Sequence, residues 1–203
     1  GQKYELEFTN KAKQPIYIEL GLAYNNTTNA NVHEDVFSAS KRTLADKLIP
    51  AYNSTNTWWG ATVWKNAPIG KIGENPADYT VGITANGFIK VYEMLTNYTQ
   101  LKQDGVRNAF VANSILVQGG AMTPSKFFPD EKDQLLGRVG MGMNYDTKER
   151  FFVIVNGSDT SGCTTEMLAN IFLKYNCTVA VELSNGLATV GVDKGSLMFV
   201  PPT

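Results

Sequence analysis

Tryptophan residues gather in one polar stretch of the sequence, where they could either bind a carbohydrate or a partner or pack into the core. Residues 52–64 read YNSTNTWWGATVW and hold all three tryptophans of the chain. An indole ring offers a flat apolar face with one N–H donor, so Trp58 and Trp59 are candidates to stack against sugar rings or a partner. The alternative is a pair of strands whose tryptophans point into the core, because tryptophan is highly buried on average.

The other reactive side chains match no familiar catalytic or metal-binding motif. His33, the only histidine, lies in the polar text NANVHEDVF and is expected to be a solvated loop residue. No serine stands in a G-x-S-x-G elbow, so a Ser-His-Asp triad has no support. The acidic run DEKD at residues 130–133 is most simply an exposed turn, with a calcium site as the alternative. Cys163 and Cys177 have neither zinc nor C-x-x-C spacing, so we expect two buried free thiols, no metal centre and no cofactor.

The composition excludes several classes of protein. With 203 residues, of which 43% are hydrophobic and 18% charged, the chain is expected to fold as one domain with its own core. The net charge is −1 and the basic residues are spread along the chain, so nucleic acid is not an expected partner. No window approaches the roughly 20 apolar residues that a membrane span needs. The Asn- and Thr-rich, charge-poor composition favours an extracellular or virion surface.

Hairpin patterns occur in the first half of the chain. Residues 4–8 and 16–20 alternate apolar and polar side chains around the turn-forming text TNKAKQP, which predicts paired strands. Residues 79–92 predict a second hairpin around Asn86-Gly87, since this dipeptide favours a tight turn between strands. Residues 36–49 have enough apolar spacing for a helix or an irregular insert.

A helix and a strand are expected next along the chain. Residues 94–102 have helical spacing, and Gly105 is placed to form the C-cap. Residues 109–117 read as one strand, closed by a turn at Gly119-Gly120.

The last third has the clearest alternation of strand and helix. Residues 138–145 predict a strand, and the apolar residues 151–155 predict a central strand that ends at Asn156-Gly157. A helix capped by Thr164 or Thr165 should run to Tyr175, with one buried face made of Met167, Leu168, Ile171 and Phe172.

A buried strand over residues 179–183 follows this helix. A strand, helix and strand of these lengths favour a parallel pair with a right-handed crossover. The fold class expected is therefore α+β: a mixed β-sheet with flanking helices, a β-α-β unit in the last third and β-hairpins in the first half.

The order of these features resembles the phosphodiester glycosidase family. Members have an arginine before a run of small residues, an apolar strand closed by Asp-Gly, a helix with E-L/M-A and a final A-L-N-L-D-G-G-G-S segment. This chain supplies, in order, Arg138, Gly142, Asn156-Gly157, Gly162, Glu166 with Met167-Leu168-Ala169, and AVELSNGLA. The text QDGVRNAFVANSILVQGG is a weaker match. The resemblance implies a single domain over residues 1–203, with a family-like core at 79–200 and N-terminal strands and an aromatic loop region at 1–78.

This sequence departs from the family's pattern at several positions. Asn156 replaces the aspartate of Asp-Gly, and the acidic glycine loop becomes Ser184, Asn185, Gly186, Leu187 and Ala188. Glycosidases use a pair of carboxylates, and serine and asparagine cannot take that role. Glu182 lies two residues before Ser184, so it should point to the same face of its strand and offers one remaining carboxylate.

Three functions are compatible with this pattern. The one that we favour is a non-catalytic binding or structural module, such as a phage tail or baseplate component that contacts cell-surface glycans or other virion or cell-surface proteins. Its candidate residues for a glycan or sugar-phosphate ligand are Arg138, Asn156, Ser184, Asn185, Trp58 and Trp59. The alternative is an active hydrolase in which Arg138 holds the phosphate and Glu166 or Glu182 acts as acid or base. The third is an architectural domain without a ligand.

Overall fold

The computed structural model describes most of the second half of the chain and short segments of the first half. The described residues are 4–9, 15–20, 47–48, 62–64, 67–69, 79–93, 96–157, 161–186, 192–193 and 196–197. None of the helices in these ranges is long and apolar enough to cross a membrane.

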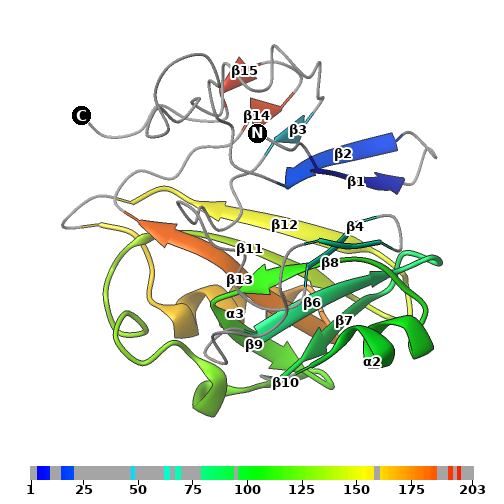
Figure 1. Cartoon of the computed structure of the whole chain (residues 1–203). Helices are drawn as coiled ribbons and strands as arrows, with labels where there is room; N and C mark the ends of the chain where they lie inside the picture. The colour runs from blue at the N-terminus through cyan, green and yellow to red at the C-terminus, as the bar shows by residue number, and fades with distance from the viewer. Residues whose placement is uncertain are drawn as a thin grey trace, which may run out of the picture.

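Two five-stranded sheets form the body of the molecule (Figure 1). The first sheet has the order β5-β4-β8-β6-β7 and consists of β4 (Thr62–Trp64), β5 (Ala67–Ile69), β6 (Tyr79–Thr84), β7 (Ile89–Tyr92) and β8 (Val106–Ala112). The second has the order β10-β9-β13-β11-β12 and consists of β9 (Ser114–Gln118), β10 (Ala121–Met122), β11 (Gly137–Met143), β12 (Arg150–Val155) and β13 (Val179–Gly186). Every pairing among these strands is antiparallel.

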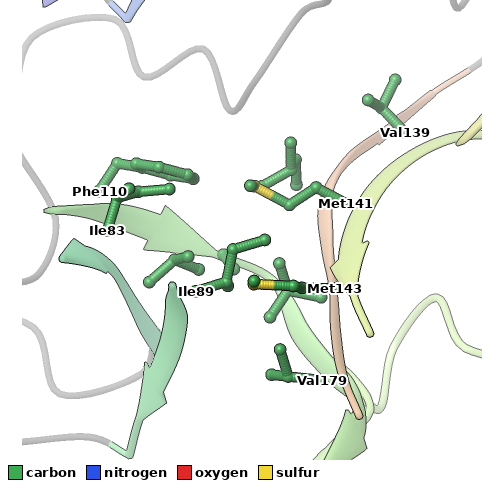
Figure 2. Close-up of a cluster of buried hydrophobic side chains, with 11 residues drawn as sticks. Ile83, Ile89, Phe110, Val139, Met141, Met143 and Val179 are labelled. Carbon is green, nitrogen blue, oxygen red and sulfur yellow. The ribbon is translucent and has the colours of Figure 1, made fainter. Parts of the chain in front are cut away.

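The two sheets pack face to face around an apolar core. Figure 2 shows Ile83, Ile89 and Phe110 of the first sheet opposite Met141 and Met143 of the second. Alternate residues of each strand point to this layer, because successive side chains of a strand lie on opposite faces. The remaining buried members of the core are Val81, Ala112, Val139, Val179, Val181 and Leu183.

A helix covers the outer face of each sheet. The helix α3 (Thr165–Lys174) packs Leu168 and Phe172 against Leu116 and Ala180 of the second sheet. The shorter α2 (Tyr98–Gln103) packs Leu101 against Val106 and Ala109 of the first sheet. The layers are thus helix, sheet, sheet and helix.

Two small sheets and a 3-10 turn complete the described elements. β1 (Tyr4–Thr9) pairs with β2 (Pro15–Leu20), and β3 (Lys47–Leu48) pairs with β14 (Val192–Asp193), which also pairs with β15 (Ser196–Leu197). The 3-10 helix η1 spans Pro124–Lys126.

The fold class and both predicted hairpins are confirmed. β1 with β2 and β6 with β7 are antiparallel pairs, and the second turns over residues 84–87, with Asn86 inside the turn and Gly87 at a φ of +75°. Residues 36–49 lie outside the described residues except for Lys47–Leu48, which form a strand and not a helix.

The strand predicted over residues 109–117 is two strands in different sheets. β8 ends at Ala112 and β9 begins at Ser114, so the chain passes from the first sheet to the second at Asn113. Apolar residues continue through both strands, which is why the sequence reads as one.

The predicted β-α-β unit is present, but its strands are not neighbours. β12 and β13 run in the same direction because both are antiparallel to β11, which lies between them. β12 is therefore the last strand in the order among the described residues, and not a central one. All six of its residues are half-buried.

The two helices differ in detail from their predicted bounds. α2 begins at Tyr98 because the Asn97 side chain accepts a hydrogen bond from the backbone N–H of Gln100, and residues 96–97 are not helical. α3 has the predicted N-cap at Thr164. Met167, however, is 50% exposed, and the buried face is formed by Thr165, Leu168, Ala169 and Phe172.

Candidate functional site

Arg138 is the most unusual buried residue of the structure. It follows Gly137 on β11, and its neighbours Val139, Met141 and Met143 point into the layer between the sheets. The Arg138 side chain therefore points to the opposite face, toward α3. It is 0% exposed there, which is rare for an arginine unless its charge is paired.

The protein satisfies all three nitrogens of the Arg138 guanidinium. Nε donates to the carbonyl oxygen of Cys163 at 2.7 Å, and Nη1 donates to Oε1 of Glu182. Nη2 donates to the carbonyl oxygens of Glu131 at 2.6 Å and Gln134 at 3.0 Å. Four of the five N–H groups of this fork therefore donate to acceptors of the protein, which leaves no bidentate edge for an external phosphate in this conformation.

Glu182, on β13, is the partner of Arg138 and is also 0% exposed. Its Oε2 accepts hydrogen bonds from the Ser114 hydroxyl at 3.1 Å and from the Thr165 hydroxyl at 3.4 Å. Its Oε1 accepts from Arg138 and, at 3.5 Å, from the Asn185 amide. We call Arg138, Glu182, Ser114, Thr165 and Asn185 the polar cluster.

A β-bulge decides which residues share the face of Glu182. On β11 the step from Val139 to Gly140 corresponds to two steps on β13, from Ser184 to Glu182. Ser184 therefore lies opposite Val139, whose side chain points into the layer between the sheets. The prediction that Ser184 shares the face of Glu182 is wrong, because the bulge places Asn185 there instead.

The segment 128–136 covers the polar cluster from outside. The Asn185 amide donates to Oε2 of Glu131 at 2.7 Å, and the backbone N–H of Thr165 donates to the carbonyl of Lys132 at 2.9 Å. Leu136 and Cys163 exchange two backbone hydrogen bonds of 3.2 and 3.0 Å. These bonds, with those from Arg138, fix the segment over the ion pair.

Glycines permit this close approach of backbone segments. A Cβ on Gly157 would meet the backbone of Gly137, and one on Gly162, whose φ is +135°, would meet the backbone of Leu136. The Asn156-Gly157 pair thus holds the end of β12 against the start of β11. Asn156 itself is exposed, and its Oδ1 accepts from the N–H of Gly157 at 3.0 Å.

The structure brings together only part of the predicted site. Arg138, Glu182 and Asn185 are in contact. Glu166 is exposed on the first turn of α3 and is not among the hydrogen-bond partners of Arg138. Trp58, Trp59 and Leu187 lie outside the described residues, as does His33.

Two members of the cluster, Ser114 and Thr165, were not predicted as site residues from the sequence. Ser114 is the first residue of an apolar strand and Thr165 the first residue of α3, positions where a hydroxyl is common. The available signal was a polar side chain next to apolar runs, as in the text NSILV.

The described residues contain no group of three His, Cys, Asp or Glu side chains that could hold a metal ion. Asp130 and Asp133 are exposed on turns, as the predicted turn requires. Cys163 and Cys177 are buried free thiols, as predicted. Burial raises the pKa of each thiol to about 11, so neither is a reactive thiolate at neutral pH.

Comparison with known proteins points to one family. The family model for phosphodiester glycosidases matches residues 26–186. A zebrafish N-acetylglucosamine-1-phosphodiester alpha-N-acetylglucosaminidase, solved as a catalytic domain auto-inhibited by its pro-peptide, is 16% identical with a TM-score of 0.70. That match covers 98% of this chain and 75% of the zebrafish chain, and at this identity it establishes the fold alone.

A hypothetical protein from Synechocystis is 15% identical, with 98% of this chain and 39% of that one covered, and its TM-score of 0.42 is too low to support a shared fold. No curated protein sequence matches the chain.

Proposed function

This chain belongs to the phosphodiester glycosidase family, and we propose that it is a non-catalytic member, a binding or structural module that keeps the family's fold. One observation carries this proposal. Arg138 and Glu182, two of the three charged residues predicted for an active site, are fully buried and paired with each other.

A catalytic acid or base must reach the substrate oxygen directly or through one water. Both oxygens of Glu182 accept hydrogen bonds from protein donors, and the segment 128–136 lies over the pair. Removing one partner of such a pair leaves an unpaired buried charge, which costs about 3–5 kcal/mol. A substrate would have to supply that free energy before Glu182 could act.

The carboxylates that a glycosidase also needs have amide or hydroxyl replacements in this sequence. Asn156, Ser184 and Asn185 stand where the family pattern has acidic or glycine residues, and none of them can transfer a proton near neutral pH. Glu166 is exposed and is not among the hydrogen-bond partners of Arg138 or Glu182. These replacements support binding without turnover.

The ligand class that we propose is a glycan or a sugar phosphate. Trp58 and Trp59 would supply stacking faces, and the exposed Asn156 would supply hydrogen bonds. The Asn- and Thr-rich composition favours an extracellular protein or a virion component such as a phage tail or baseplate part, in contact with surface glycans or neighbouring proteins.

The test is a hydrolysis assay. The protein is incubated with an N-acetylglucosamine phosphodiester and with wall teichoic acid, and released sugar is measured. We expect no turnover above that of a heat-denatured sample. Turnover by the wild type that Glu182→Gln or Arg138→Ala abolishes, while both variants stay folded by circular dichroism and Glu166→Gln keeps activity, would sink this proposal.

The alternative function is an active phosphodiester glycosidase. It is favoured by the match to the family over residues 26–186 and by the likeness to the fold of an enzyme's catalytic domain. The assay above decides between the two. A glycan array then tests binding, with Trp58→Ala and Trp59→Ala expected to lose the signal and Trp64→Ala as the matched control; an array without any bound sugar favours an architectural role.

A further inference from the structure

The polar cluster has the composition of a receptor for a small oxyanion. We propose that the Glu182 carboxylate is the built-in occupant of an anion-binding site, and that the site accepts a free carboxylate of the size of acetate when the end of this side chain is removed. Nothing in the family assignment requires such a site.

The donors converge on the Glu182 carboxylate from four separate parts of the chain. Arg138 on β11 donates to Oε1, while Ser114 on β9 and Thr165 at the start of α3 donate to Oε2 at 3.1 and 3.4 Å. Asn185 on β13 approaches Oε1 at 3.5 Å. A planar group with one negative charge and two oxygens is the ligand that fits a guanidinium and two hydroxyls in this arrangement.

The donors are held in place by bonds that do not involve Glu182. Arg138 also donates to the carbonyls of Cys163, Glu131 and Gln134, and Ser114 Oγ accepts from the backbone N–H of Phe128 at 3.0 Å. These groups would therefore keep their positions after the carboxylate is removed. A preorganised site loses little free energy to ordering when a ligand binds.

The charges around the site favour a single anion. Arg138 is the cation in contact with the carboxylate, and both side chains are 0% exposed. The Asn185 amide is shared, because it also donates to Oε2 of Glu131 at 2.7 Å. An anion of low charge is therefore expected to bind better than a divalent one, because a buried site with one cation cannot neutralise two negative charges.

The variant Glu182→Ala makes the site available. It removes Cγ, Cδ and both carboxylate oxygens, which are the heavy atoms of acetate, and leaves Arg138 without its counterion. Acetate should restore the missing charge and volume, whereas acetamide has the same shape without the charge.

The experiment measures the melting temperature of Glu182→Ala in sodium acetate, acetamide and sodium chloride, each at 100 mM. For a dissociation constant of about 10 mM, we expect acetate alone to raise the melting temperature by about 3–5 °C. The wild type and Glu182→Gln, whose sites are filled, should not respond to acetate beyond the effect of chloride. The double variant Arg138→Met/Glu182→Ala should also lose the response.

If Glu182→Ala is unfolded in plain buffer, its refolding yield is measured in place of its melting temperature. The urea-denatured variant is then refolded in the same three solutions, and a yield that rises in acetate only supports the site. The proposal is overturned if the melting temperature, or the refolding yield, is the same in acetate as in acetamide. A variant that does not refold in either solution also overturns it. The hydrolysis assay does not depend on this result, so the two proposals fail separately.

Discussion

The two faces of β11 are both buried, but they are packed in different ways. Toward the first sheet, Val139, Met141 and Met143 enter an apolar layer that needs only matching volume. Toward α3, the strand presents Arg138 and then Gly140 and Gly142. On this second face Arg138 depends on Glu182 and three backbone carbonyls, and the two glycines depend on the position of Phe172.

The glycines on the second face are explained by packing. A Cβ on Gly140 or Gly142 would lie 2.8 or 2.7 Å from the Phe172 ring of α3, closer than carbon atoms pack. An arginine followed by glycines resembles a ligand-binding loop in the sequence. In the structure the glycines let α3 pack close to β11, and the arginine is part of a buried ion pair. Packing and charge pairing therefore explain this arginine-glycine motif without a substrate.

The largest expected effect is at Arg138. Arg138→Met leaves the Glu182 carboxylate buried without a counterion, and we expect a loss of about 3–5 kcal/mol in the free energy of unfolding. The double variant Arg138→Met/Glu182→Leu removes both charges and should recover most of this loss. Urea unfolding of the three proteins measures both values.

Recovery in the double variant is the informative part of that experiment. If the double variant is as unstable as the single one, the hydroxyls and carbonyls around the pair carry the stability, and the ion pair is not its main source.

A smaller effect is expected at Gly142. Gly142→Ala places a methyl group against the Phe172 ring and the carbonyl oxygen of Val179, and overpacking of this kind costs about 1–3 kcal/mol. The additional change Phe172→Leu should return part of the loss, because it removes the ring contact but not the carbonyl contact. A Gly142→Ala protein as stable as the wild type would show that α3 shifts freely on this face.

At neutral pH the smallest effect concerns the two thiols under α3, whose contribution changes only as the pH rises above about 9. Burial raises the pKa of Cys163 and Cys177 from 9.0 in their ordinary state to about 11. Because the unfolded thiols ionise first, the stability that the neutral thiols contribute is complete below pH 9 and falls as the pH rises from about 9 to about 11. Unfolding at about pH 8 and about pH 10.5 measures the fall.

The control for this pH dependence is Cys163→Ala/Cys177→Ala. Burial also raises the pKa of Tyr98 and Tyr145, so these tyrosines destabilise the protein at high pH in the same direction. The double alanine variant should lose less stability between the two pH values than the wild type. Equal losses would mean that the tyrosines dominate and that the thiols are not the source.

Local patterns in the sequence predict helices and strands, and the structure confirms those whose ends depend on a single turn or a single cap. The Asn86-Gly87 turn and the Thr164 cap are examples. The break between β8 and β9 was not predicted, because the apolar runs on both sides of Asn113 read as one strand and no glycine or proline marks the change of sheet.

The site was less predictable than the fold for a physical reason. Burial of Arg138 depends on the carbonyls of Cys163 and Glu131, which are 25 and 7 residues away and are brought there by the sheet and by the segment 128–136. The bulge that moves Asn185 onto the face of Glu182 shifts the register by one residue. Because side chains alternate between the two faces of a regular strand, the sequence predicts Ser184 on the face of Glu182. The sequence near Glu182 does not mark the bulge that places Asn185 there.

The passage of the chain from one sheet to the other at Asn113 has a consequence for synthesis. The described strands of the first sheet all precede Asn113, and those of the second all follow it. Once Ala112 has left the ribosome, all described strands of the first sheet can pair, but the apolar inner face of that sheet, with Val81, Ile83 and Phe110, has no covering layer. Until β11 and β13 emerge, that face is exposed to aggregation and to capture by a chaperone.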